Sequence, residues 1–210
     1  KAIHLLSTIH NHSDLKVQNL KKYNFEILLH ESELFIEWYL EKHLKLNLNN
    51  SEKNEFQNIL EKHFNSLTLK QNNLVLRDFH VDNLIYLNDR DGIHQLGLID
   101  YQDALIGSSV YDFVSLIEDV RHPIKNDLKN SLIEMYSKLI SVDQNELKRE
   151  ISFYSIQRNL KIVGIFSRLK YRDDKKNYFP MIEVAWGFIK SHLKNNEYKD
   201  LNNWMNNIMN

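Results

Sequence analysis

The chain has 210 residues, with 27 basic and 28 acidic side chains and a formal net charge of −1. This near-neutral balance argues against a nucleic-acid or membrane-surface partner, because binding either usually requires a basic face. The absence of cysteine excludes disulfides and thiolate chemistry and fits the reducing cytoplasm, where we expect the protein to work. No apolar run approaches the ~18 residues that a membrane-spanning helix needs.

Helical periodicity dominates the first third of the chain. Residues 2–12 are predicted to form a short amphipathic helix, and residues 24–46 a longer helix or two in succession. A further helix is predicted over residues 51–67, with Ser51 as its N-cap.

Two short apolar runs, residues 83–87 and 94–99, interrupt this pattern and predict strands. Asp91-Gly92 between them is a hairpin turn signal. If the chain turns there, the strands are antiparallel and Asn83 lies opposite positions 97–100. The predicted hairpin therefore brings Asn83 and Asp100 together at its open end.

Helical patterns return after the hairpin, over residues 108–120 and 127–141. A long helix from Asp143 to about Tyr171 is predicted to open with the capping box Asp143-x-x-Glu146. A last helix is predicted to begin at Pro180, where proline is tolerated as a first helical residue. The predicted fold class is mainly α with one small central β-hairpin.

Oxygen-bearing side chains converge at the open end of this hairpin. Asp78 reaches it from the loop just before the first strand, and Asn83 and Asp100 from the strand ends. Carboxylate and amide oxygens are hard ligands that suit Mg²⁺ together with phosphate oxygens and water. The alternative is that all three are ordinary strand-end residues, where Asp and Asn are common.

The stretches "LRDFHVDNLIYL" (76–87) and "GLIDYQDALIGSSVYDFVSLIEDVR" (97–121) carry a family resemblance. They resemble the aminoglycoside phosphotransferase and choline-kinase-like small-molecule kinases, which have H-G-D-x-x-x-x-N, then I-D-[FW]-x-D, then a helix starting Y-D-L. "LFIEWYL" (34–40) and "RNLKIVGIFSRLKYRD" (158–173) are similar to blocks of one branch, the bacterial cell-wall amino-sugar kinases. That branch phosphorylates N-acetylmuramate and N-acetylglucosamine at the anomeric hydroxyl.

The resemblance implies roles for the three converging residues. Asp78 would orient or deprotonate the attacking hydroxyl, while Asn83 and Asp100 would hold Mg²⁺ on the phosphates of ATP. Phosphoryl transfer passes through a loose transition state, so positioning and charge neutralisation would do most of the work.

Other residues of the same stretches are implied to support the loop. Asp103 would bind a second metal ion or hydrogen-bond within the loop, and Asp112 would brace the loop from a first helical turn. His80 falls where the family often has histidine, but a packed, hydrogen-bonded role is the commoner one for a single histidine. Leu76-Arg77 replaces the family's usual His-Gly, and Tyr101-Gln102 leaves no glycine for a flipping activation segment.

Cations follow one face of the predicted helix 143–171. At ~100° per residue they lie within roughly 80° of one another, and they are Arg158, Lys161, Arg168 and Arg172. Arg158 and Lys161 are the best candidates for binding substrate or phosphate, the alternative being pairing with Asp and Glu. Glu37 and Trp38 could line a sugar site, although such a stretch is more often core.

A nucleotide lobe is missing from this pattern. The first glycine of the chain is Gly92, beyond Asp78, so residues 1–77 lack a Gly-rich phosphate loop and read as helices. We therefore expect residues 1–210 to be the C-terminal, substrate- and metal-binding lobe of a protein-kinase-like α+β fold. This piece alone, without the N-terminal lobe in cis, is expected to be inactive.

The expected function is ATP-dependent phosphorylation of a hydroxyl on a small molecule, an amino sugar of cell-wall recycling. Two alternatives stay open, a kinase for an aminoglycoside, choline or another small alcohol, and a catalytically silent helical binding module. The cations of helix 143–171 disfavour a polycationic aminoglycoside. A silent module would have no need of Asp78, Asn83 and Asp100 together.

Overall fold

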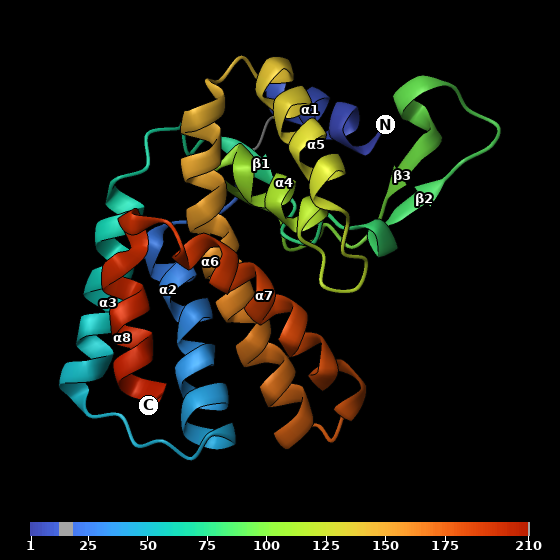
Figure 1. The fold of residues 1–210 in the computed structure, drawn as a ribbon. Helices are drawn as coiled ribbons and strands as arrows, with labels where there is room; N and C mark the ends of the chain where they lie inside the picture. The colour runs from blue at the N-terminus through green and yellow to red at the C-terminus, as the bar shows by residue number, and fades with distance from the viewer. Residues whose placement is uncertain (13–18, 210) are drawn as a thin grey trace. The chain divides into compact units, whose positions relative to one another are not determined.

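A computed structural model describes residues 1–12 and 19–209. The chain divides into two compact units, the first comprising Lys1–Tyr23 and Thr68–Ile151, the second Asn24–Leu67 and Ser152–Asn210. Helix α6 (Gln144–Tyr171) contributes residues to both (Figure 1). None of the helices in the described residues is long and apolar enough to cross a membrane.

The first unit consists of helices and two small antiparallel sheets. Helix α1 packs on α4 and α5, and α4 packs on β1. The helices are α1 (Ala2–Asn11), α4 (Ser109–Ile117), α5 (Asn126–Leu139) and the start of α6; the strands are β1 (Asn73–Val75), β2 (Leu84–Tyr86), β3 (Leu96–Leu98) and β4 (Leu105–Gly107). The helices predicted over residues 2–12, 108–120 and 127–141 are confirmed, with ends shifted by a few residues.

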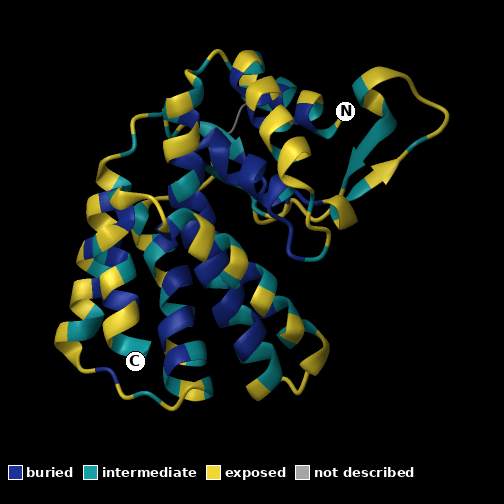
Figure 2. Cartoon of the chain, viewed as in Figure 1, coloured by how far each residue is buried: buried dark blue, intermediate teal, exposed yellow. Residues whose placement is uncertain are grey.

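The central hairpin forms in the predicted register. Leu84 pairs with Leu98 and Tyr86 with Leu96, and the Ile99 amide donates to the Asn83 carbonyl at 3.2 Å. The connection is longer than a tight two-residue turn, because it contains the 3-10 turn η3 (Gly92–Gln95), whose first residue, Gly92, has φ 61°. The ribbon itself contains no buried residue (Figure 2).

A second sheet was not predicted. Strand β1 pairs with β4 through Leu74 and Ile106. Residues beside Lys22 extend this sheet, since the Ile106 amide donates to the Lys21 carbonyl at 2.9 Å and its carbonyl accepts from the Tyr23 amide at 2.6 Å. The expectation of a single hairpin is therefore wrong, because strands this short have too few residues to show an alternating pattern.

The core of the first unit is built on α4. Every residue of α4 except Leu116 is buried (Figure 2). The Phe113 ring stacks on that of Tyr136 from α5, with centroids 4.2 Å apart. Ser108 caps the helix by accepting from the Val110 amide at 3.2 Å. These contacts fix the first turn of α4, which faces the loop after β1.

The second unit is helical. Helices α2 and α3, and α3 and α8, lie side by side, and α7 packs on α8 (Figure 1). Its elements are α2 (Phe25–Leu34), the π-helix η1 (Phe35–His43), α3 (Asn50–Asn65), the rest of α6, the 3-10 turns η4 (Lys176–Met181) and η5 (Asn196–Tyr198), α7 (Ile182–Leu193) and α8 (Lys199–Met209).

Two of the predicted helix starts are wrong and a third agrees with the structure. The N-cap of α3 is Asn49, not Ser51, because Asn49 and Glu52 form a reciprocal capping box. Pro180 lies inside η4, and α7 begins two residues later. At α6, Asp143 accepts from the Glu146 amide at 3.1 Å, as an N-cap should.

Aromatic side chains fill the centre of the second unit. Phe35 and Phe56 are completely buried, and Phe56 packs against Trp204 of α8 with centroids 4.9 Å apart. The Trp204 indole also donates to the Glu52 carbonyl at 3.0 Å, so this ring links α8 to the start of α3.

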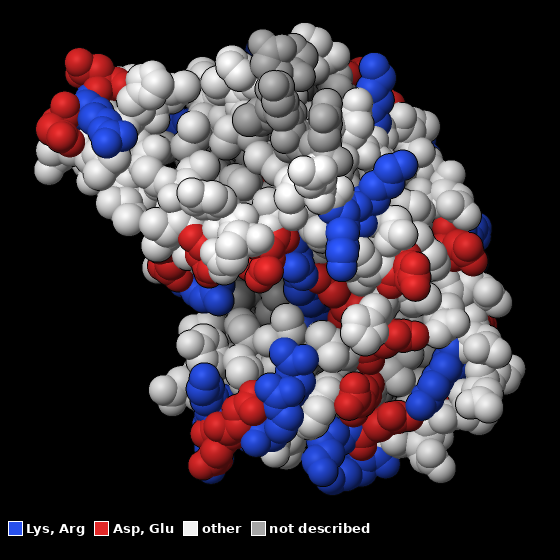
Figure 3. All heavy atoms as spheres, turned by 180° about the vertical axis from the view of Figure 1, so that it is seen from behind, with Lys and Arg blue, Asp and Glu red and all other residues white. Residues whose placement is uncertain are grey.

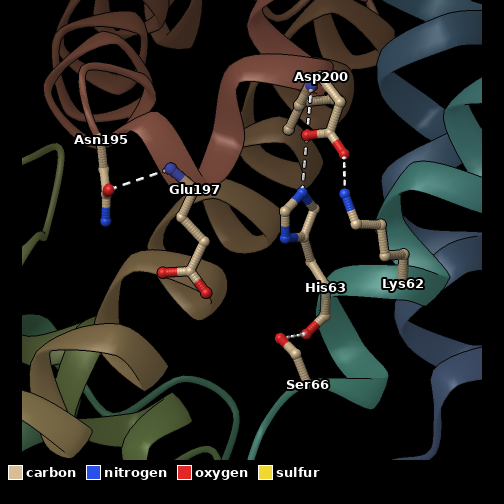
Figure 4. A network of polar contacts seen from close by, with 7 residues as sticks. Lys62, His63, Ser66, Asn195, Glu197 and Asp200 are labelled. Carbon is tan, nitrogen blue, oxygen red and sulfur yellow. Dashed lines mark hydrogen bonds and ion pairs between the residues drawn. The ribbon is translucent and has the colours of Figure 1, made fainter.

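A polar network ties α8 to the end of α3 (Figure 4). The Asp200 carboxylate binds Lys62 Nζ at 2.6 Å and His63 Nε2 at 2.9 Å. Burial, the largest single influence, raises the pKa of Asp200, but hydrogen bonds from Lys62, His63 and the Leu201 amide together lower it to about 2. The stabilisation from Asp200 is therefore lost only as the pH falls from 3.8 towards 2.

Charged side chains of both signs lie at the surface among uncharged ones. On the face drawn in Figure 3, Lys and Arg lie interspersed with Asp and Glu. This distribution agrees with the formal net charge of −1.

We expect His10 of α1 to make the first unit sensitive to mild acid. Its Nε2 donates to the Leu74 carbonyl at 3.1 Å and its Nδ1 lies 2.7 Å from the Tyr136 hydroxyl. Burial lowers the pKa of His10 from 6.5 to about 4, outweighing the backbone hydrogen bond. Between these pH values the unfolded chain binds a proton that the folded chain does not, so the stability present above pH 6.5 is lost on acidification.

Urea unfolding at pH 7 and pH 5 tests this expectation. The free energy of unfolding should fall by roughly 1–2 kcal/mol over that interval because of His10. His10→Gln should remove that part of the pH dependence, whereas His4→Gln, at an exposed position of the same helix, should retain it. An identical pH dependence in wild type and His10→Gln would show that the ring does not carry the effect.

Candidate functional site

The loop that contains Asp78 is held in place by hydrogen bonds to a buried carboxylate of α4. Asp112, which is 0% exposed in the first turn of α4, accepts from the Leu76 amide at 2.6 Å and from the Arg77 amide at 2.9 Å. Arg77 has φ 71°, a left-handed conformation that is uncommon for a residue other than glycine. One carboxylate of α4 therefore binds the backbone amides of both residues that directly precede Asp78.

Asp78 and Asn83 are joined within this loop. The Asn83 amide nitrogen donates to the Asp78 carbonyl at 2.9 Å, and Asn83 ends the 3-10 turn η2 (Val81–Asn83). This bond orients the amide so that Asn83 Oδ1 is the oxygen left to bind a ligand. The Asp78 side chain is exposed.

Asp100 lies at the same end of the hairpin as Asn83. It follows Ile99, whose amide donates to the Asn83 carbonyl, and it has a left-handed φ of 59°. Gln102 donates to Asp100 Oδ1 at 2.7 Å, while Asp103 is exposed in the next turn. An amide oxygen and a carboxylate at one ribbon end are a donor set that fits Mg²⁺.

His80 belongs to a cluster that sequence reasoning did not identify. Ligand atoms of His80, Asp82 and Asp119 lie within 4.8 Å of one another. His80 is buried, and its Nε2 lies 3.4 Å from the Asn83 amide nitrogen. The signal available in the sequence was the run "EDVRH" (118–122), which places charged residues directly after the apolar end of the predicted helix.

The predicted substrate residues of the second unit have different surroundings. Arg158 is 4% exposed, and within the described part of the chain its Nη1 has no hydrogen-bond partner. Lys161 Nζ donates to Glu31 Oε1 at 3.1 Å. This is the pairing with an acidic side chain that the sequence left open as the alternative to ligand binding. Arg172 pairs with its neighbour Asp173. On η1, Glu37 is exposed and Trp38 partly so.

Comparison with models of protein families shows to which family the chain belongs. The model described as "Phosphotransferase enzyme family" matches residues 2–149, well over half of the chain. The chain belongs to the phosphotransferase enzyme family. The matched residues include the Asp78 loop, the hairpin and α4, but not Arg158, Lys161 or Arg172.

Curated relatives share a single name. The chain is 33% identical over 178 residues to an N-acetylmuramate/N-acetylglucosamine kinase of Neisseria meningitidis, covering 81% of this chain and 52% of that protein. It is 30% identical over 177 residues to the N-acetylmuramate/N-acetylglucosamine kinase of Pseudomonas putida, covering 81% and 51%. The chain thus spans about half the length of these two relatives.

A solved structure agrees at the level of the fold. A Ralstonia eutropha protein provisionally named an aminoglycoside phosphotransferase superposes with a TM-score of 0.53, covering 90% of this chain and 64% of that one. The two sequences are only 14% identical, so the likeness concerns the fold alone.

Proposed function

We propose that residues 1–210 form the substrate- and metal-binding part of an ATP-dependent kinase that phosphorylates a hydroxyl of an amino sugar. The observation that carries the proposal is the hydrogen bond from the Asn83 side chain to the Asp78 carbonyl within one loop, together with the position of Asp100 at the same end of the hairpin. The name shared by the two curated relatives supports an amino sugar of the N-acetylmuramate or N-acetylglucosamine type as the acceptor.

Each loop residue has a distinct part in this proposal. Asp78 orients the acceptor hydroxyl and accepts its proton as the oxygen attacks. Asn83 and Asp100 would hold Mg²⁺, which when bound neutralises charge on the nucleotide phosphates. Asp112 keeps the loop in place by binding the amides of Leu76 and Arg77.

Arg158 is proposed to bind an anionic group. A buried guanidinium nitrogen without an acceptor is costly, and a carboxylate or phosphate of a ligand would provide one. Lys161 is a weaker candidate for this role, because Glu31 already neutralises it.

The nucleotide lobe is proposed to come from outside residues 1–210. In the described residues before Asp78, the elements are helices, the short strand β1 and the bridge at Lys22, and the first glycine of the sequence is Gly92. The relatives are about twice as long as the stretch that matches. Residues 1–210 alone should therefore show negligible turnover, which a purified fragment with ATP and N-acetylglucosamine would test.

Substitution of Asp78 tests the proposed chemistry in the full-length protein. Asp78→Asn should lower kcat with ATP and N-acetylglucosamine by about 100- to 1,000-fold, because a general base is lost, and should leave KM for ATP nearly unchanged. Asp89→Asn, at an exposed position of the hairpin connection, is the matched control and should keep full activity. A kcat within threefold of wild type would refute the role of Asp78. Choline and an aminoglycoside in the same assay test the other acceptors.

A further inference from the structure

A mixed cluster of donors and acceptors adjoins the Asp78 loop. Asp82 Oδ1 lies 2.9 Å from His122 Nε2, and Asp119 Oδ1 accepts from the Arg121 amide at 3.0 Å. His80 completes the group from within the loop. The five side chains come from two neighbouring segments of the first unit, the loop itself and the residues that follow α4.

Burial within this cluster is graded. Asp119 and His80 are buried, whereas the side chains of Arg121, Asp82 and His122 are 30%, 47% and 50% exposed. The cluster thus has a buried base, Asp119 and His80, and a partly exposed rim.

One oxygen at the base has no protein donor. Asp119 Oδ1 receives the Arg121 amide, but Asp119 Oδ2 is buried and has no hydrogen-bond partner among residues 1–12 and 19–209. The Asp119 carboxylate faces His80 and Asp82, since their ligand atoms lie within 4.8 Å of one another. A buried carboxylate oxygen without a donor is destabilising, and a hydroxyl group of a ligand would satisfy it.

Charge favours a polyhydroxy ligand over a metal ion. The Arg121 guanidinium already lies near both carboxylates, with Nη1 3.5 Å from Asp119 Oδ1 and Nε 3.7 Å from Asp82 Oδ2. A divalent cation placed between these carboxylates would be repelled by the guanidinium. A sugar hydroxyl can instead donate to a carboxylate while accepting from Arg121 or histidine.

We propose that Asp119, with Asp82 and Arg121, forms the subsite that binds hydroxyl groups of the acceptor sugar. The placement fits the proposed chemistry, on which this inference rests, because Asp82 directly precedes Asn83 and His80 lies two residues after Asp78. A sugar held on Asp119 would lie against the same loop that presents the proposed base. Asp119 is therefore a substrate-binding residue, distinct from the residues that hold metal and nucleotide.

Direct binding of N-acetylglucosamine, measured by calorimetry without ATP in the full-length protein, tests the subsite. Asp119→Asn replaces the unsatisfied acceptor by a donor and should weaken sugar binding roughly 10- to 100-fold. KM for ATP should change less than twofold, and Asp89→Asn should alter neither quantity. Sugar affinity within twofold of wild type in a folded Asp119→Asn variant would overturn the proposal.

Two further measurements keep the outcome unambiguous. If Asp119→Asn does not fold, Asp82→Asn at the exposed rim should still weaken sugar binding several-fold, and an unchanged affinity there also overturns the proposal. Mn²⁺ titration without nucleotide tests the metal alternative: loss of an ion in Asp119→Asn with unchanged sugar affinity rejects the sugar subsite. If the wild type binds the sugar but does not phosphorylate it, the proposed function fails while the subsite stands.

Discussion

Replacing Gly164 with alanine should destabilise the second unit by about 3–5 kcal/mol. A Cβ at Gly164 would lie 2.3 Å from the Leu34 carbonyl carbon and 2.6 Å from both the Leu34 oxygen and the Phe35 nitrogen. These atoms are backbone at the junction of α2 and η1, so no flexible side chain can move away. Helix α6, which contains Gly164, must therefore move away from the α2–η1 backbone. This cost outweighs the helix propensity of alanine, which is about 1 kcal/mol better than that of glycine.

Gly187 provides the matched control. It lies inside α7, is exposed, and a Cβ there would meet nothing within 4 Å. Gly187→Ala should therefore stabilise the protein by up to about 1 kcal/mol through helix propensity alone. Urea unfolding followed by circular dichroism measures both variants. A Gly164→Ala protein as stable as wild type would show that α6 does not approach the α2–η1 backbone this closely.

Local patterns in the sequence predicted the helices and the hairpin because their causes are local. The periodicity of α1, α4 and α5 and the Asp91-Gly92 signal are contained within a few residues each. The β1–β4 pairing joins Leu74 to Ile106, and no short-range signal announces a contact between segments so far apart. The π-helix η1 was also unpredictable, because the same apolar spacing suits an ordinary α-helix.

The residues of the candidate site also differ in whether local sequence could predict them. Asn83 and Asp100 could be placed together from the sequence, because the hairpin register fixes which residues are opposite. The role proposed for Asp119 could not be predicted from the sequence, because it rests on the burial of this side chain and on a carboxylate oxygen without a donor. Arg158 and Lys161 looked equivalent on one helix face, and only the structure shows that Lys161 has Glu31 as a partner.

Asp112→Asn should cost about 3 kcal/mol of stability and displace the loop that carries Asp78. Both carboxylate oxygens accept backbone amides, from Leu76 at 2.6 Å and from Arg77 at 2.9 Å, in a fully buried site. Asparagine turns one acceptor into a donor that faces an N–H group, which leaves two buried donors unsatisfied. Arg77 would then be free to leave its left-handed conformation, and this movement shifts the neighbouring Asp78.

Stability and turnover together identify this role in the full-length protein. Because an angstrom of misplacement can cost a kinase much of its rate, kcat with N-acetylglucosamine should fall by about 100-fold at a temperature where the variant is still folded. Asp127→Asn, at an exposed position in α5, should change stability by less than about 0.5 kcal/mol and leave kcat intact. If Asp112→Asn lost stability but kept kcat, the carboxylate would support only the packing of α4. A loss of both shows that a buried residue with no route to the substrate sets the position of the proposed base.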